Sequence, residues 1–132
     1  MITLSSIHTS DRAGAALQAT LTRLNAGTAG ANVALYDTVR PANGAAAGGS
    51  PLAAFVLPKP AGVIATGILT LGSVPDALIS ATGVAAWARV TVGAVHEFDC
   101  SVTDTAGTGT IKLSTTQLYA GGTVRLSSGT LS

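Results

Sequence analysis

The pattern of hydrophobic and polar positions divides the chain into one helical segment followed by a long series of short strands. Residues 10–25 carry apolar side chains at intervals of three and four, the spacing that places them on one stripe of a helix. These positions are Ala13, Leu17, Leu21 and Leu24. Ser10 can cap the first turn, and the glycine-rich run after Asn25 can end the last one. We expect an amphipathic helix of about four turns here, preceded by an N-terminal arm at residues 1–9.

From residue 31 onward, short apolar runs alternate with turn-forming residues. The runs are residues 32–38, 52–57, 63–71, 77–82, 84–92, 95–103, 110–113 and 123–126. They are rich in Val, Leu, Ile and Thr, and Gly, Pro, Asp, Asn and Ser separate them, as is typical of strands joined by turns. This spacing indicates a sandwich or a barrel. We predict a mainly β fold in which residues 31–132 form an antiparallel β-sandwich of jelly-roll type.

The two longest runs, residues 84–92 and 95–103, are expected to pair with each other. Gly93 and Ala94 suit a tight antiparallel hairpin between them. Because side chains alternate along a strand, the second run divides into two faces. Strict alternation points His96, Phe98, Cys100 and Val102 inward and Glu97, Asp99 and Ser101 outward.

The composition adds that the surface carries little charge. Only 10% of the 132 residues are charged, against about 25% in an average soluble domain. A net charge of +1 provides no field to attract nucleic acid or anionic lipid. Hydrophobic residues make up 47% of the chain, but only one Trp, two Tyr and two Phe are aromatic. We therefore expect a single domain, residues 1–132, with a thin core and a surface that meets other protein, including further copies of itself.

Cysteine use and the N-terminal sequence favour synthesis in the cytosol. Cys100 is the single cysteine, so the chain cannot form an internal disulfide. Residues 1–6 lack the basic and apolar regions of a signal peptide. The most apolar stretch, residues 60–75, contains three glycines and is shorter than the roughly 20 residues of a spanning helix. We expect neither an export signal nor a membrane segment.

The densest group of ionisable residues lies between positions 96 and 104. Its members are His96, Glu97, Asp99, Cys100 and Asp104. His96 and Cys100 are four positions apart, about 13 Å along a strand. That distance is too far for a direct hydrogen bond, or for shared ligation of zinc without a partner strand. Glu97 and Asp99 lack the oxygen-rich loop that completes a calcium site. We predict no catalytic residue and no metal site, and we expect that the protein is not an enzyme.

Phosphate and nucleic-acid sites are also disfavoured. The sequence NGAAAGGS, residues 43–50, has no following Lys-Ser or Lys-Thr and leads into a predicted strand, whereas a phosphate loop leads into a helix. The basic residues are scattered singly and are not interleaved with aromatic residues as in a nucleic-acid platform. We therefore expect no cofactor and no nucleic-acid partner.

The remaining candidate residues favour contacts with other protein. Trp87 and Arg89 share one strand face, where either Trp87 fills the core with Arg89 at its rim, or both residues anchor an interface. Residues 40–43, Arg-Pro-Ala-Asn, predict a defined turn at the start of an uncharged, adaptable loop. Arg40 is the side chain of that loop best suited to directional hydrogen bonds. The candidate interface residues are Tyr36, Arg40, Pro41, Asn43, Trp87 and Arg89.

Three segments of the chain, taken together, resemble a protein family. They are NVALYDTVRPANG at residues 32–44, ATGVAAWARV at residues 81–90 and GTGTIKLSTTQLYAGGTVRLSSGTL at residues 107–131. In this order they are similar to a family of small structural proteins of tailed bacteriophages, over about residues 24–131. The matching positions are Leu35, Tyr36, Arg40, Pro41, Ala42, Gly83, Ala85, Trp87, Arg89, Gly121, Gly122, Thr123 and Val124. The chain departs from the family at Ala88, where an aromatic residue is usual, and in residues 99–109, where a glycine-rich turn is usual.

The resemblance implies a role in virion assembly and names no catalytic residue. Within the particle we favour a capsid decoration, or cement, protein, present as a dimer or trimer over the junctions between subunits of the major capsid protein. Such a protein would be located in the virion after synthesis in the host cytoplasm. A neck, collar or tail component, with other virion proteins as partners, is the alternative of the same class. A receptor- or carbohydrate-binding β-sandwich module is the alternative of another class.

Overall fold

One helix and a series of short strands follow one another along the chain. The computed structural model describes residues 3, 5–42 and 45–132, and within these ranges helix α1 precedes twelve strands. The bounds are α1 (Ser6–Leu24), β1 (Asn32–Tyr36), β2 (Ala53–Val56), β3 (Gly62–Ala65), β4 (Ile68–Leu71), β5 (Ala77–Leu78), β6 (Gly83–Val84), β7 (Trp87–Val92), β8 (Val95–Asp104), β9 (Ile111–Leu113), β10 (Gln117–Leu118), β11 (Thr123–Val124) and β12 (Leu126–Leu131). The prediction of a mainly β fold with one N-terminal helix is confirmed.

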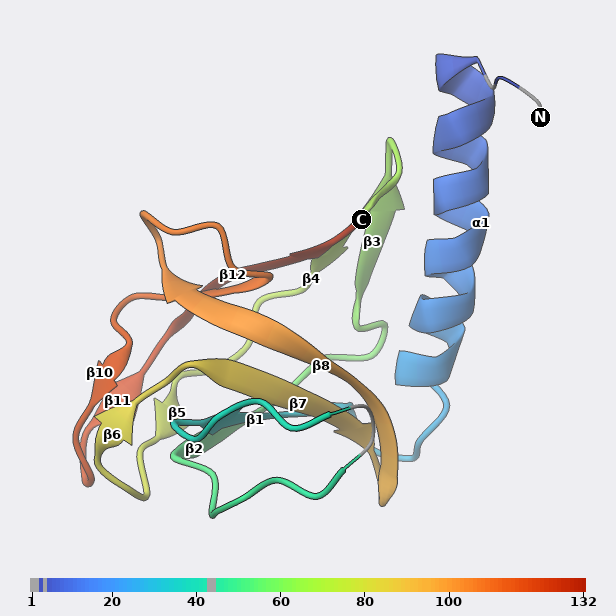
Figure 1. The fold of residues 1–132 in the computed structure, drawn as a ribbon. Helices are drawn as coiled ribbons and strands as arrows, with labels where there is room; N and C mark the ends of the chain where they lie inside the picture. The colour runs from blue at the N-terminus through green and yellow to red at the C-terminus, as the bar shows by residue number, and fades with distance from the viewer. Residues whose placement is uncertain (1–2, 4, 43–44) are drawn as a thin grey trace.

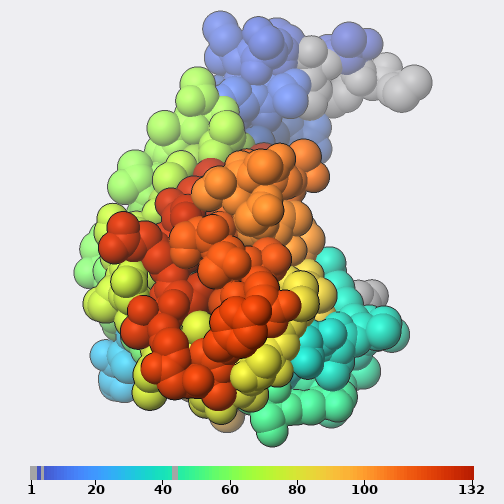
Figure 2. Space-filling view, turned by 90° about the vertical axis from the view of Figure 1, so that its left-hand side faces the viewer, coloured from blue at the N-terminus to red at the C-terminus, as the bar shows by residue number. Residues whose placement is uncertain are grey.

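Eight of the strands form one mixed sheet that curls into a half-barrel (Figure 1). Their order is β2-β1-β7-β8-β9-β12-β4-β3, and all neighbours are antiparallel except β8 and β9, which run parallel. Two short antiparallel ladders, β6 with β10 and β5 with β11, lie at the end of the molecule away from α1, the end that faces the viewer in Figure 2. The antiparallel pairing expected from the sequence is thus correct for all neighbours but one.

The main core lies inside the curl of the sheet, where α1 covers it. The helix packs against β3, β4 and β7. It buries Leu17, Leu21 and Leu24, the leucines of the predicted stripe. Each buried leucine stabilises the fold by about 2 kcal/mol relative to an exposed one. From the sheet come mostly Val, Leu, Ile and Ala, together with Phe55.

The helix begins earlier than the sequence pattern indicated. Residues 6–9, which we expected in the arm, form its first turn. Ser5 is the cap, in place of the predicted Ser10, because its hydroxyl accepts a hydrogen bond from the main-chain N–H of His8 at 3.1 Å. This first turn is exposed, so it lacks the apolar periodicity that identified the rest of the helix. Within the described ranges, no helix combines the length and the hydropathy needed to cross a membrane.

Residues 63–71, which we expected as one strand, form most of the hairpin of β3 and β4. The chain reverses at Thr66 and Gly67, whose φ angles are 49° and 75°. Two consecutive positive φ angles are typical of the tight turns that suit twisted antiparallel strands. The turn lies against α1, since a Cβ atom on Gly67 would come within 3.4 Å of the Ala13 Cβ.

β7 and β8 form the predicted hairpin across Gly93, whose φ is 61°. Their ladder contains a β-bulge at Glu97, which has no partner residue on β7. The extra residue turns His96 to the face that carries Asp99 and turns Glu97 toward α1. The prediction that placed His96 inward and Glu97 outward is wrong, because strict alternation assumes a ladder without a bulge.

Residues 105–110 connect β8 to β9 and make this pair parallel. The segment folds back against Thr103, so that Ile111 at the start of β9 lies beside Val102. The Thr103 hydroxyl accepts a hydrogen bond from the N–H of Gly109 at 3.0 Å. A Cβ atom on Gly109 would lie only 2.8 Å from the Thr103 nitrogen, so glycine allows this close approach. The short connection replaces the dozen or more residues that usually join parallel strands.

Candidate functional site

The outer face of β1, β7 and β8, opposite the main core, carries a group of aromatic and charged side chains. We name this group the outer cluster, and its members are Tyr36, Arg40, Trp87, Arg89, His96 and Asp99. Strand register brings its centre together. Tyr36 on β1 lies opposite Trp87 on β7. Arg89 on β7 lies opposite Asp99 on β8, and side chains at such opposed positions are about 5 Å apart and interact.

The aromatic part of the outer cluster is a stack of three planar groups. The rings of Tyr36 and Trp87 lie 4.6 Å apart between centroids, with an angle of 16° between their planes. The Arg89 guanidinium carbon lies 5.4 Å from the centroid of the Trp87 ring, within the range of a cation–π contact. Trp87 is buried, and its indole N–H faces the Thr38 hydroxyl at 3.4 Å. The stack therefore fills a second, smaller apolar layer outside the main core.

The ionic part of the outer cluster is centred on Asp99. Its carboxylate accepts hydrogen bonds from Arg89 Nε at 2.8 Å and Arg89 Nη2 at 3.0 Å, and its Oδ1 lies 3.0 Å from His96 Nε2. The side chains of Arg89 and Asp99 are only 13% and 7% exposed. The hydrogen bonds of Arg89 are the largest cause that lowers the pKa of Asp99, and His96 adds to them against the opposing effect of burial. The same contact raises the pKa of Arg89.

Two arginines attach the connection between β1 and β2 to this face. Arg89 Nη2 donates to the main-chain oxygen of Ala45 at 2.6 Å. Arg40, which belongs to the connection, donates from Nη2 to the main-chain oxygen of Asp99 at 2.7 Å. Charge-assisted hydrogen bonds of this length are about twice as strong as neutral ones. Residues 40 and 45 are therefore attached to β8 and β7, respectively.

The structure brings four of the candidate interface residues together. Tyr36, Arg40, Trp87 and Arg89 all belong to the outer cluster, whereas Pro41 lies beside Arg40 in the sequence and is half-buried. Asn43 lies outside the described residues. The sequence left two interpretations of Trp87, a core residue or an interface anchor. The structure shows Trp87 buried, on the face of the sheet opposite the main core.

Two members of the outer cluster were not candidates in the sequence. Asp99 was placed on an outward edge and His96 was placed inward, so their contact could not be foreseen. The alternating pattern of β8 gives no sign of the bulge that joins them. Arg89 and Asp99 are ten positions apart, and a hairpin at Gly93 places them opposite each other. This spacing is the sequence signal that could have indicated the ion pair.

The structure separates His96 from Cys100. The bulge places His96 on the outer face, while Cys100 belongs to the main core. Burial raises the pKa of the Cys100 thiol to about 12, so the sulfur is protonated at neutral pH and is a poor nucleophile. Among residues 3, 5–42 and 45–132, no group of three His, Cys, Asp or Glu side chains is placed to hold a metal ion.

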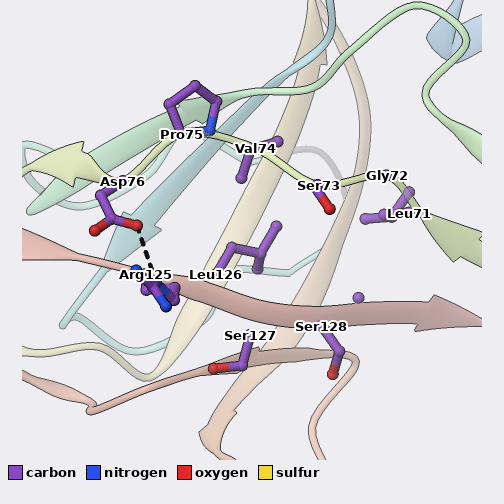
Figure 3. A pocket seen from close by; sticks show the side chains of 11 residues that line it. Leu71, Gly72, Ser73, Val74, Pro75, Asp76, Arg125, Leu126, Ser127 and Ser128 are labelled. Carbon is purple, nitrogen blue, oxygen red and sulfur yellow. Dashed lines mark hydrogen bonds and ion pairs between the residues drawn. The ribbon is translucent and has the colours of Figure 1, made fainter.

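Two openings in the surface are large enough to accept part of a partner. The larger has a volume of about 640 Å³ and lies between α1 and β8. The smaller, about 320 Å³, lies between residues 71–76 and 125–129, where the ladders β4–β12 and β5–β11 separate (Figure 3). In Figure 3 the side chains of Val74 and Leu126 lie between the two segments. The Asp76–Arg125 ion pair, with 3.3 Å between Oδ1 and Nε, borders this smaller cleft.

No protein-family model, curated protein or solved structure matches this chain. A functional assignment therefore depends on the residues and on their arrangement.

Proposed function

We propose that this protein is a non-enzymatic structural component of a tailed-bacteriophage particle, and specifically a decoration protein that binds the major capsid protein. The observation that carries the proposal is an apolar projection. Helix α1 and the β3–β4 hairpin extend together beyond the rest of the sheet (Figures 1 and 2). They expose three branched apolar side chains, Ile7, Val63 and Ile68, to 74%, 68% and 43%. We name these three residues the apolar tip.

Exposed apolar groups of this kind favour contact with other protein. Covering a valine or isoleucine side chain is favourable by about 1.5–3 kcal/mol when burial is complete. The low charge of the chain, 10% of its residues, adds little repulsion against a neighbouring subunit. The resemblance of three sequence segments to tailed-phage structural proteins supports the particle as the place where this contact is made.

The outer cluster supports the same function in a different way. Its hydrogen bonds attach Arg40 to β8 and Ala45 to β7. Arg40 and the half-buried Tyr36 remain proposed contact residues, because they lie nearer the surface than Trp87. We also keep a jelly-roll-like sandwich as the finer description of the fold, with the half-barrel as its main layer and the ladders β5–β11 and β6–β10 as the beginning of a second. Self-association as a dimer or trimer is part of the proposal.

The number of copies per particle tests the proposal. Quantitative mass spectrometry of purified virions should find hundreds of copies of a decoration protein, and roughly 6 to 30 copies of a neck, collar or tail component. A small copy number would exclude decoration in favour of those alternatives. Absence from the particle, combined with binding of the isolated protein to host cells or glycans, would instead favour the receptor- or carbohydrate-binding alternative.

A matched pair of variants tests the apolar tip. Val63 and Leu78 are both 68% exposed, and they lie at different ends of the molecule. We expect Val63→Ser to lower the copy number and Leu78→Ser to leave it unchanged, while both variants keep the wild-type Tm. Equal incorporation of the two variants would show that the apolar tip does not contact the shell.

A further inference from the structure

One edge of β8 is open over most of its length. Residues 95–101 pair with β7 on one side. On the other side β9 pairs only with residues 102–104. Within the part of the chain that the structure describes, no strand pairs with the second edge of residues 95–101. The open edge lies across a groove from α1 instead.

The groove is wide because α1 packs elsewhere. The helix contacts β3, β4 and β7, and it approaches β8 mainly through an ion pair between Arg23 and Glu97, with 2.7 Å between Nε and Oε2. Toward the groove α1 presents the small side chains of Ala13, Ala16 and Thr20. The groove has a volume of about 640 Å³, and a cavity of about 260 Å³ shares Thr20, Glu97 and Phe98 with it. The ion pair links α1 to β8 beside the groove.

The strand side of the groove offers main-chain hydrogen-bonding groups. Arg40 lines the groove and donates to the main-chain oxygen of Asp99. This guanidinium occupies the position at which an added strand would present an N–H group to the Asp99 carbonyl. An added strand would therefore displace Arg40 from that oxygen and leave its guanidinium free to pair with an acidic group. Arg40 has no carboxylate partner among the described residues. The groove therefore combines an open strand edge with an opposite wall of small side chains. Its carboxylates, Glu97 and Asp99, are paired with Arg23 and Arg89, and the charge of Arg40 has no such partner among the described residues.

We propose that this groove binds an extended segment of a partner protein, which adds to β8 as a further antiparallel or parallel strand. The five residues from Glu97 to Ser101 span about 17 Å, so an extended partner segment of five residues matches their length. Its side chains that face α1 would be small or apolar, and an acidic group would lie beside Arg40. Strand addition obtains affinity from main-chain hydrogen bonds and specificity from alternate side chains. The inference depends on the proposed function only in that the partner is a protein.

A random octapeptide library displayed on a carrier provides the probe. We expect selection against the purified full chain to enrich peptides with alternating small or apolar residues and one Asp or Glu. Binding of a synthetic selected peptide should slow hydrogen exchange of the Asp99 and Ser101 amides, which point to the open edge, and should leave the Phe98 and Cys100 amides, which point to β7, as they were. The same peptide with alternate main-chain nitrogens methylated cannot donate to β8, so its affinity should fall at least tenfold.

Two helix variants locate the binding site. Ala16 lines the groove and Ala15 does not, and both are exposed on α1. Leucine is nearly as good a helix former as alanine, so both variants should fold. We expect Ala16→Leu to fill the groove and weaken the selected peptide at least tenfold, and Ala15→Leu to leave its affinity unchanged. Arg40→Gln should weaken acidic peptides by about tenfold, the value of one charge-assisted hydrogen bond.

Three results would overturn the inference. They are a library without enriched peptides, selected peptides that bind both leucine variants equally, and methylated peptides that bind as tightly as unmodified ones. Each of these results leaves the copy number in the virion unaffected, so failure of the groove can be told apart from failure of the decoration function. Conversely, if the protein binds peptides in the groove but is missing from virions, only the decoration function is refuted.

Discussion

Replacing Asp99 with asparagine tests whether the outer cluster stabilises the fold. The carboxylate accepts two hydrogen bonds from Arg89, at 2.8 and 3.0 Å, and shares a third with His96 at 3.0 Å. Asparagine has a single acceptor oxygen, so Asp99→Asn leaves the largely buried Arg89 without a counter-charge. Removing one partner of such a pair costs about 3 kcal/mol in the free energy of unfolding. In a domain of this size that corresponds to a fall of about 10 °C in Tm.

An exposed pair in the same protein provides the matched control. Asp76 and Arg125 have the same residue types, but their side chains are 42% and 70% exposed. Because solvent screens this pair, Asp76→Asn should cost less than about 0.5 kcal/mol. Urea denaturation of both variants at pH 7 measures the two costs. Equal destabilisation by the two substitutions would refute the claim that burial makes the Asp99 pair important.

The pH dependence of the same variant gives a second check. In the folded state the pKa of Asp99 lies below its ordinary value of 3.8, chiefly because of the Arg89 hydrogen bonds. The ionised carboxylate therefore stabilises the fold fully above the unfolded-state pKa, and this contribution is lost as the pH falls through the folded-state pKa. The Tm difference between wild type and Asp99→Asn should shrink as the pH falls below about 4. A difference that stays constant down to pH 2 would contradict this assignment.

Three further predictions follow from close contacts and burial. Gly30→Ala should lower the free energy of unfolding by more than about 2 kcal/mol in urea denaturation, because its Cβ would lie 1.7 Å from the main-chain oxygen of Leu57. The control is Gly14→Ala, which lies in open space on the helix. It should raise the free energy of unfolding by up to about 1 kcal/mol. The Cys100 thiol, with its pKa raised to about 12, should resist iodoacetamide at pH 8 until urea unfolds the protein, and rapid labelling of the folded protein by mass spectrometry would contradict its burial. Deleting residues 46–49 should change the Tm by less than about 4 °C, since Ala45 keeps its contact with Arg89. The same deletion should lower incorporation of the protein into virions. Unchanged incorporation would show that this segment is only a spacer.

The candidate site was predicted in its residue types but not in its geometry. Sequence reasoning selected Trp87 and Arg89 because they share one strand face, and Arg40 because it is the loop side chain best suited to directional hydrogen bonds. Tyr36 was selected as a candidate interface residue at a position that matches the resembled family. The structure places these four together. It adds Asp99 and His96, which a strictly alternating strand would hold on opposite faces. The bulge at Glu97 removes that separation, and its position depends on how β8 pairs with β7.

The elements that could be predicted are those with local signals. The leucine stripe of α1, the runs of Val, Leu and Ile, and the turn at Gly93 each depend on neighbouring residues, and the structure confirms them. The reversal at Thr66 interrupted one of these runs without a strong turn signal, because threonine rarely adopts a positive φ. The short strand β10 and most of β12 were missed, since their residues carry little apolar pattern of their own.

The sequence by itself determined a mainly β domain of low charge, with one amphipathic helix and a hairpin of two long strands. These properties follow from composition and from periodicity, which act over a few residues. Only the tertiary structure decided that residues 105–110 fold back to make β8 and β9 parallel. It also decided that β9 pairs only with the last three residues of β8, which leaves the rest of that edge open, and that α1 packs on β3 and β4. The physical reason is that strand partners and helix placement depend on the joint packing of distant segments, which no local pattern records.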